Sequence, residues 1–217
     1  MNYLEITTGD TRYAYATGRI RGLEKYLLKE AEFSRIKEGK DLAESFQELS
    51  RFYPYSDSMK ICQQPSGFER GLEEEWRRTY RELRSFVPEP ELIDLFWIDQ
   101  DFHNFKVLFK LKAQKKLPED IERIENLSSA GTLDSRLVAE AVLREDFSNL
   151  PLFLKDIFQQ VAGIIEKGAA PREIDFFLDR AYFRIFLSGM QSYKDGFLTE
   201  LTKKIIDGYN IKNFLRI

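Results

Sequence analysis

The chain has 217 residues, of which 43% are hydrophobic and 32% charged, and a formal net charge of −3. This composition is typical of a globular protein with a sizeable core, and the weak negative charge gives no electrostatic surface for nucleic acid or an anionic membrane. The single cysteine, Cys62, excludes an internal disulfide and a thiolate metal cluster. No segment approaches the ~20 apolar residues of a membrane span, and the opening residues MNYLEITTGD lack the features of a signal peptide.

Apolar residues recur at steps of three and four along most of the chain, which predicts helices. The first helix is predicted from about 12 to 28 and the second from about 41 to 52. A third passes through Trp76 and Leu83 until Pro88 and Pro90 break it. Further helices are predicted at about 101–116, 118–126, 134–146, 150–167, 172–188 and 192–206. No segment alternates long enough to be a strand, so the predicted fold class is all-α.

Two hexapeptides share the pattern D-x-x-N-apolar-K: DFHNFK begins at Asp101 and DGYNIK begins at Asp207. An aspartate that opens a helix accepts a hydrogen bond from a backbone N–H about three residues on, and an amide at that position can reach back to the cap. We therefore predict four structural helix caps, namely Asp101, Asn104, Asp207 and Asn210. The apolar residue that follows each asparagine is predicted to be buried, and Lys106 and Lys212 to point outward.

The offset of 106 residues between the hexapeptides also aligns other positions of the chain. It places Leu72 on Leu178, Trp76 on Tyr182, Tyr80 on Phe186, Leu95 on Leu201 and Lys110 on Arg216. Few of the aligned residues are identical, but aromatic and aliphatic positions coincide, as in a duplicated helical unit. The sequence therefore predicts two similar multi-helix modules in tandem, residues 1–112 and 113–217.

Motifs for a catalytic, cofactor or metal site are missing from the sequence. It contains neither a phosphate-binding P-loop nor G-x-G-x-x-G, and His103 is the only histidine. The consecutive Glu73, Glu74 and Glu75 are predicted to form a solvated arc, because a helix spreads successive residues around its circumference. The lysines 110, 112, 115 and 116 are predicted to be the solvated end of a helix. We expect no catalytic residue, cofactor, metal or small-molecule substrate.

Four segments in order resemble one known family: YAYATGRIRGLEKYLL, DFHNFKVLFK, IDFFLDRAYFRIFLS and IIDGYNIKNFLRI. They are similar to the C subunit of archaeal and bacterial V-type (A-type) rotary ATPases, called subunit d in eukaryotes. The resemblance implies an all-helical funnel of three modules that catalyses nothing. It also implies a peripheral socket on the cytoplasmic side of the membrane, which couples the rotating shaft subunits to the proteolipid ring. The resemblance covers the first two modules, and the third is absent from the sequence.

Two other classes of function remain open at the level of sequence. A general helical scaffold or adaptor that binds protein partners would have the same repeat and composition, whereas a small all-α hydrolase or lyase lacks catalytic pairs. The last residues carry an apolar cluster, Ile211, Phe214, Leu215 and Ile217. These side chains are predicted to fold back on the second module or to meet a second chain in a dimer, through the face that the third module would cover.

Overall fold

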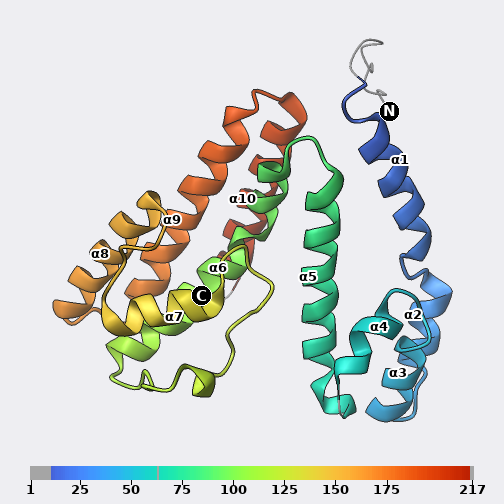
Figure 1. The fold of residues 1–217 in the computed structure, drawn as a ribbon, viewed down its shortest axis with the longest axis horizontal. Helices are drawn as coiled ribbons and strands as arrows, with labels where there is room; N and C mark the ends of the chain where they lie inside the picture. Colours follow the sequence, from blue (N-terminus) through green and yellow to red (C-terminus); the bar gives the residue numbers. More distant parts are fainter. Residues whose placement is uncertain (1–10, 63, 216–217) are drawn as a thin grey trace. The chain divides into compact units, whose positions relative to one another are not determined.

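The computed structural model describes residues 11–62 and 64–215 (Figure 1). These ranges contain helices and turns and no strand, which confirms the all-α prediction. The α-helices are α1 Ala14–Leu23, α2 Glu30–Lys37, α3 Leu42–Leu49, α4 Tyr55–Ser58, α5 Phe68–Phe86, α6 Pro90–Ala113, α7 Ser135–Arg144, α8 Leu152–Glu166, α9 Pro171–Ser192 and α10 Gly196–Phe214. Short 3-10 helices are η1 Glu24–Tyr26, η2 Met59–Ile61, η3 Pro65–Gly67 and η4 Ile121–Arg123.

The chain divides into two compact units, Met1–Ile93 and Asp94–Ile217, with the boundary in the first turn of α6. The predicted modules instead placed all but the last residue of α6 in the first half of the chain. In the structure most of α6 belongs to the second unit, because its side chains are part of that unit's core. Compact units and duplicated modules need not have the same boundaries, so the duplication into two modules stays a prediction.

Helix α6 begins at Pro90, eleven residues before the predicted start at Asp101. The sequence interpretation took Pro88 and Pro90 as breaks and Asp101 as the opening of a new helix. Proline is well suited to the first turn, because its missing N–H would have no intrahelical partner there. The predicted helix at 118–126 was wrong as well: apart from η4, the segment 114–134 is irregular.

The core of the second unit is built around one aromatic side chain of α8. The ring of Phe158 lies 4.8 Å from that of Phe105, 4.9 Å from that of Phe109 and 5.3 Å from that of Phe147, each in an edge-on arrangement. Such pairs stabilise a core beyond the area that they bury. The side chains buried around them come from α6, α7, α8 and α9, and include Phe102, Leu108, Val138, Val142, Leu154, Val161, Ile174 and Leu178.

The first unit has a much smaller core. Its buried apolar residues among those described are Ala16 and Met59. Helix α5 lies close to η2, since a Cβ at Gly71 would come within 2.5 Å of the Met59 Sδ. Helix α1 contacts α5 through side chains: the Arg19 guanidinium lies 4.7 Å above the ring of Phe86.

The helix boundaries show the same offset as the sequence repeat. Ser192, the end of α9, follows Phe86, the end of α5, by 106 positions. Gly196, the start of α10, follows Pro90, the start of α6, by the same number. The break between α5 and α6 thus recurs 106 positions later as the break between α9 and α10. This agreement with the sequence offset supports the proposal of two modules. Arg216, at the end of the aligned range, lies outside the described residues.

Candidate functional site

The first D-x-x-N motif lies in the middle of α6, where Asp101 is 1% exposed. Its carboxylate accepts hydrogen bonds from the backbone N–H of Thr132 at 3.1 Å and of Leu133 at 3.0 Å. The Thr132 hydroxyl donates a third bond at 2.5 Å. Gly131 precedes these donors, and a Cβ at that position would come within 2.2 Å of the Asp101 Oδ1. Asp101 therefore binds the backbone of the loop before α7.

The same loop is held by three neighbours of Asp101 on α6. The Asn104 side chain accepts from the Ser128 N–H at 2.7 Å and donates to the Ser128 carbonyl at 2.8 Å, as a paired strand residue would. The Ser128 hydroxyl donates to the Gln100 side chain at 3.0 Å, and the His103 Nε2 lies 2.9 Å from the Asn126 carbonyl oxygen. We call Gln100, Asp101, His103 and Asn104 the α6 clamp, and residues 126–133 the clamped loop.

Burial raises the pKa of the Asp101 carboxyl to about 6. Desolvation is the largest cause, and the hydrogen bonds from Thr132 and Leu133 oppose it. The charge of Asp99 adds a smaller raising effect. A carboxyl of this kind could move a proton near neutral pH, but here all of its contacts with the loop are structural hydrogen bonds, so a reaction has no support.

The four predicted helix caps are wrong, because all four residues lie inside helices. Asp101 and Asn104 are interior to α6, and Asp207 and Asn210 are interior to α10. The N-cap of α10 is Asp195, whose side chain accepts from the Leu198 N–H at 2.8 Å. The prediction failed because the hydrogen bonds of the first motif run to a loop about thirty residues away, which a local capping rule does not consider.

The second motif has a different environment from the first. Asp207 and Asn210 are exposed on α10, and neither makes a side-chain hydrogen bond within residues 11–62 and 64–215. The apolar side chains that follow are exposed too: Ile211 by 60%, Phe214 by 76% and Leu215 by 76%. These three do not fold back on the second unit. Ile217, the fourth member of the predicted cluster, lies outside the described residues.

A cavity of about 490 Å³ lies in the first unit, between α1 with η1, the Tyr53–Tyr55 segment and α5. Most of its wall is apolar or aromatic, from Ile20, Leu23, Tyr26, Leu27, Tyr53, Pro54, Tyr55, Leu72, Trp76 and Leu83. The rings of Tyr26 and Tyr53 meet edge-on at 4.7 Å. Several of these side chains, Leu27 and Trp76 among them, are exposed. An opening of this size and composition suits an apolar ligand or the side chains of a partner protein.

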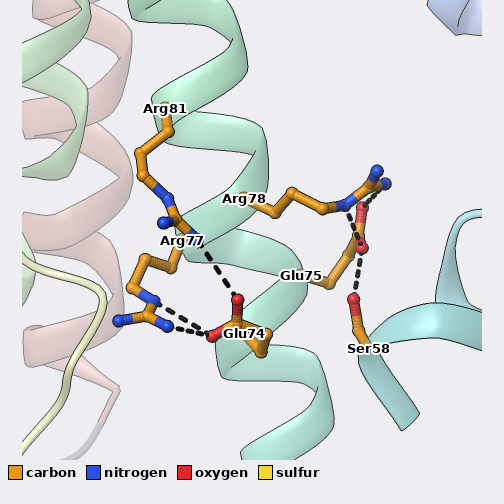
Figure 2. Close-up of polar contacts among 6 residues, drawn as sticks. All are labelled: Ser58, Glu74, Glu75, Arg77, Arg78 and Arg81. Atoms are coloured by element: carbon orange, nitrogen blue, oxygen red, sulfur yellow. Dashed lines mark hydrogen bonds and ion pairs between the residues drawn. The ribbon is translucent and has the colours of Figure 1, made fainter. Parts of the chain in front are cut away.

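Helix α5 carries two sets of ion pairs on different sides (Figure 2). Glu75, which is 8% exposed, accepts from Arg78 at 3.0 and 2.8 Å and from the Ser58 hydroxyl at 2.6 Å. Hydrogen bonding to Glu75 is the main reason why the pKa of Arg78 is raised. Glu74 pairs with Arg77 and Arg81. The prediction of a solvated arc was therefore wrong for Glu75, which joins α5 to α4 at the edge of the cavity.

Three lysines of α6 are also placed differently from the prediction. Lys106 forms a short ion pair with Asp179 of α9, and Lys110 lies 3.0 Å from Asp175. Lys112 donates to the Val142 carbonyl at 2.9 Å. These side chains are 19–33% exposed, so they bridge α6 to α9 and α7 and are not a solvated run.

The described part of the chain offers no group of three or more His, Cys, Asp or Glu residues that could hold a metal ion. Within the same residues, no helix is both long and apolar enough to cross a membrane. Three features remain to be explained: the α6 clamp, the exposed apolar side chains Ile211, Phe214 and Leu215 of α10, and the cavity of the first unit. All three are suited to contacts with polypeptide. None has the arrangement of a catalytic centre.

The comparison with protein families decides the identity. A family model described as ATP synthase (C/AC39) subunit matches residues 16–217, which is nearly the whole chain. The chain belongs to this family. No curated protein and no solved structure matches it. The C/AC39 subunit is a non-catalytic part of a V/A-type rotary ATPase, as the four sequence segments implied.

Sequence reasoning missed both the cavity and the clamp of this C/AC39 subunit, because the residues of each come from segments that are distant in the sequence. Tyr26, Tyr53 and Trp76 line one opening but come from three separate elements, and no spacing in the sequence connects them. The clamp had a signal, because Asp101 and Asn104 were found as a motif. Its partner loop, 126–133, lay almost entirely between the predicted helices 118–126 and 134–146, and no sequence pattern connected it to Asp101.

Proposed function

We propose that this chain is a non-catalytic central-rotor subunit of a V-type (A-type) ATPase. It acts as a socket that couples the rotating shaft subunits to the membrane proteolipid ring during ATP-driven ion transport or ATP synthesis. The observation that carries the proposal is the family match over residues 16–217. The position that follows from this role is peripheral, on the cytoplasmic side of the membrane.

The helical architecture supports such a role. A coupling subunit must transmit torque without bending internally, and packed helices with cross-links between them resist bending. In the second unit α6 is joined to α9 by the ion pairs of Lys106 and Lys110, and to α7 by Lys112. The clamp further fixes the irregular segment between α6 and α7.

The proposal is tested by co-purification. The affinity-tagged chain is expressed in cells that carry its own rotary ATPase, and membranes are solubilised in mild detergent before capture. We expect shaft subunits and the proteolipid ring to be recovered together with the chain. Recovery of neither set, from membranes in which both are detected by mass spectrometry, would contradict the proposal.

The contact with the shaft is expected to be partly polar, and therefore weaker at high salt. Binding of the chain to purified shaft subunits, measured by interferometry at 50 mM and 500 mM NaCl, should show a lower affinity at the higher concentration. A salt-independent affinity would show that the contact is mainly apolar.

A general adaptor remains the second candidate, and the cavity of the first unit is the observation that favours it. An adaptor would bind soluble protein partners in cells from which the rotary ATPase has been deleted, whereas a dedicated rotor subunit would lose its partners there. For the isolated chain we also propose weak self-association through the exposed Ile211, Phe214 and Leu215. Light scattering over a range of concentrations measures it, with Leu215→Ser as the variant that should abolish it.

A further inference from the structure

A groove follows the α8–α9 pair in the second unit. The two helices lie side by side and are joined by the short segment 167–170 (Figure 1). Two hollows, of about 170 and 450 Å³, lie along the pair, and both are lined by Phe177 and Arg180, so they adjoin. We call this surface the α8–α9 groove. Its apolar floor is Ile157, Ile164 and Phe177, and its cations are Lys167, Arg180 and Arg184.

The floor of the groove is apolar and firmly held. Ile157, Ile164 and Phe177 are partly buried and pack against the core of the second unit. Beside them Phe176 is 53% exposed, and the Arg172 guanidinium lies 5.2 Å from the centre of its ring. Because the floor is continuous with a packed core, the groove offers a preformed apolar surface to a partner.

The cations of the groove are not engaged within the chain. Lys167, Arg180 and Arg184 are exposed, and none of them makes an ion pair or a side-chain hydrogen bond in residues 11–62 and 64–215. Arg180 and Arg184 are four residues apart on α9, so they are neighbours of like charge on one face of the helix, which is unfavourable. An anion placed beside them would remove this repulsion.

The carboxylates of α9 are already bonded elsewhere. Asp175 and Asp179 pair with lysines of α6. Glu173, the carboxylate of the groove wall, accepts from the Ala170 N–H at 2.7 Å at the start of α9. The groove is therefore a positive surface on a chain whose net charge is −3.

We propose that the α8–α9 groove binds an acidic amphipathic helix of a partner protein. The apolar stripe of this helix lies over Ile157, Ile164 and Phe177, and its carboxylates pair with Arg180 and Arg184. A helix that lays its apolar face into a groove is a common mode of recognition, and guanidinium groups bind carboxylates with two parallel hydrogen bonds. The inference rests on the apolar floor and the unpaired cations, and does not depend on the role in a rotary ATPase.

The length of the groove and the spread of its cations favour a helix over a lipid. From Glu173 to Arg184 helix α9 rises about 16 Å, which matches about three turns of a bound helix. Lys167 lies at one end of the groove, Arg184 at the other, and Arg180 lines both hollows. An anionic lipid carries its charge at one end only, so its acyl chain would lie against the remaining cations. A helix with a carboxylate on each turn matches all of them.

The experiment measures binding of synthetic helices to the full chain by fluorescence anisotropy. The probe is a labelled helix of about 15 residues with one stripe of leucine, flanked by glutamate. One control peptide has lysine in place of every glutamate, and another has the composition of the probe with its leucines spread around the helix.

The protein variants separate the charges of the groove from its apolar part. Arg180→Glu and Arg184→Glu reverse the two arginines, and Phe176→Ala removes the exposed ring. Lys204→Glu changes the net charge equally at an exposed position of α10 outside the groove, and is the matched control. Circular dichroism checks that each variant is folded. Arg180→Gln takes the place of Arg180→Glu if the latter does not fold.

We expect the acidic helix to bind, and each arginine reversal to weaken binding by about fivefold, because an ion pair is lost and a repulsion is added. Phe176→Ala should weaken binding too, Lys204→Glu should leave it unchanged, and neither control peptide should bind. Failure of the acidic helix to bind the parent would overturn the proposal. Equal effects of Arg180→Glu and Lys204→Glu, or equal binding of the peptide with spread leucines, would overturn it as well.

Flotation with lipid vesicles tests the membrane as the alternative occupant. Vesicles of phosphatidylcholine are compared with vesicles that also contain phosphatidylserine. We expect the chain to float with neither. Flotation with the anionic vesicles alone, abolished by Arg180→Glu but not by Lys204→Glu, would make an anionic lipid surface the occupant of the groove and would overturn the proposal.

Discussion

At the scale of single residues, Asp101 explains why an acidic side chain is tolerated in the middle of a helix. Two backbone N–H groups and one hydroxyl donate hydrogen bonds to its carboxylate. The same bonds also satisfy the N–H groups of Thr132 and Leu133 in the loop. The Asp101→Ala variant should therefore lower the free energy of unfolding by about 2 kcal/mol at pH 7.5. Asp207→Ala, an exposed change at the equivalent position, should stay within about 0.5 kcal/mol of the parent. Urea unfolding measures both, and equal stability of the two variants would contradict the clamp.

The raised pKa of Asp101 gives a pH dependence of definite sign. The pKa of the folded state is about 6, above the ~3.9 of an unfolded aspartate, so the folded state binds the proton more tightly. The stabilisation is then present in full below about pH 4 and is lost as the pH rises through 6. Relative to Asp101→Asn, which cannot titrate, the parent should lose up to about 3 kcal/mol between pH 4 and pH 7.5. A parent that gains relative stability over this range would show that the hydrogen bonds outweigh burial.

Gly131 and Gly163 form a matched pair of glycines in the second unit. A Cβ at Gly131 would collide with the Asp101 carboxylate, whereas a Cβ at Gly163, inside α8, meets nothing within 4 Å. We expect Gly131→Ala to lower the free energy of unfolding by about 2 kcal/mol through overpacking. Gly163→Ala should raise it by up to about 1 kcal/mol, because alanine is the better helix former. Thermal and urea unfolding of the two variants should thus move in opposite directions.

At the scale of elements, α6 and the end of α10 should differ most in local stability. Residues 102–109 of α6 include the buried core positions, and their amides should exchange hydrogen only when the whole second unit unfolds. Residues 210–214 of α10 carry exposed Ile211 and Phe214, so their amides should exchange orders of magnitude faster. Exchange measured by mass spectrometry decides this. Equal protection of the two segments would show that the end of α10 is covered in solution.

Elements with a local signal could be predicted from the sequence. The ranges of α7, α8 and the start of α9 were each within about two residues of the structure, because apolar periodicity and flanking prolines mark them. Helix α6 was predicted too short because Pro90 was interpreted as a helix break. Proline disrupts the interior of a helix but is favoured at the first position, where it stands in α6. The clamp could not be predicted, because the donors of Thr132 and Leu133 come together with Asp101 only after the irregular segment has folded across α6.

At the scale of the whole molecule, the two compact units differ in the amount of apolar surface that they bury. Phe105, Leu108, Phe109 and Phe158 are 0% exposed in the second unit, whereas the buried apolar residues described in the first are Ala16 and Met59. Since burial of apolar area is the main source of stability, the first unit should unfold at lower urea concentration than the second. The chain has two tryptophans, one in each unit: Trp76 on α5 and Trp97 on α6.

These two tryptophans allow each unit to be followed separately. The Trp97→Phe variant leaves Trp76 as the reporter of the first unit, and Trp76→Phe leaves Trp97 as the reporter of the second. We expect the fluorescence of Trp76 to change at a lower urea concentration than that of Trp97. Circular dichroism of both variants should show the two steps in one curve, which controls for any effect of the substitutions themselves. Coincident transitions of the two reporters would mean that the units unfold as one cooperative body, so that the large core of the second unit also stabilises the cavity of the first.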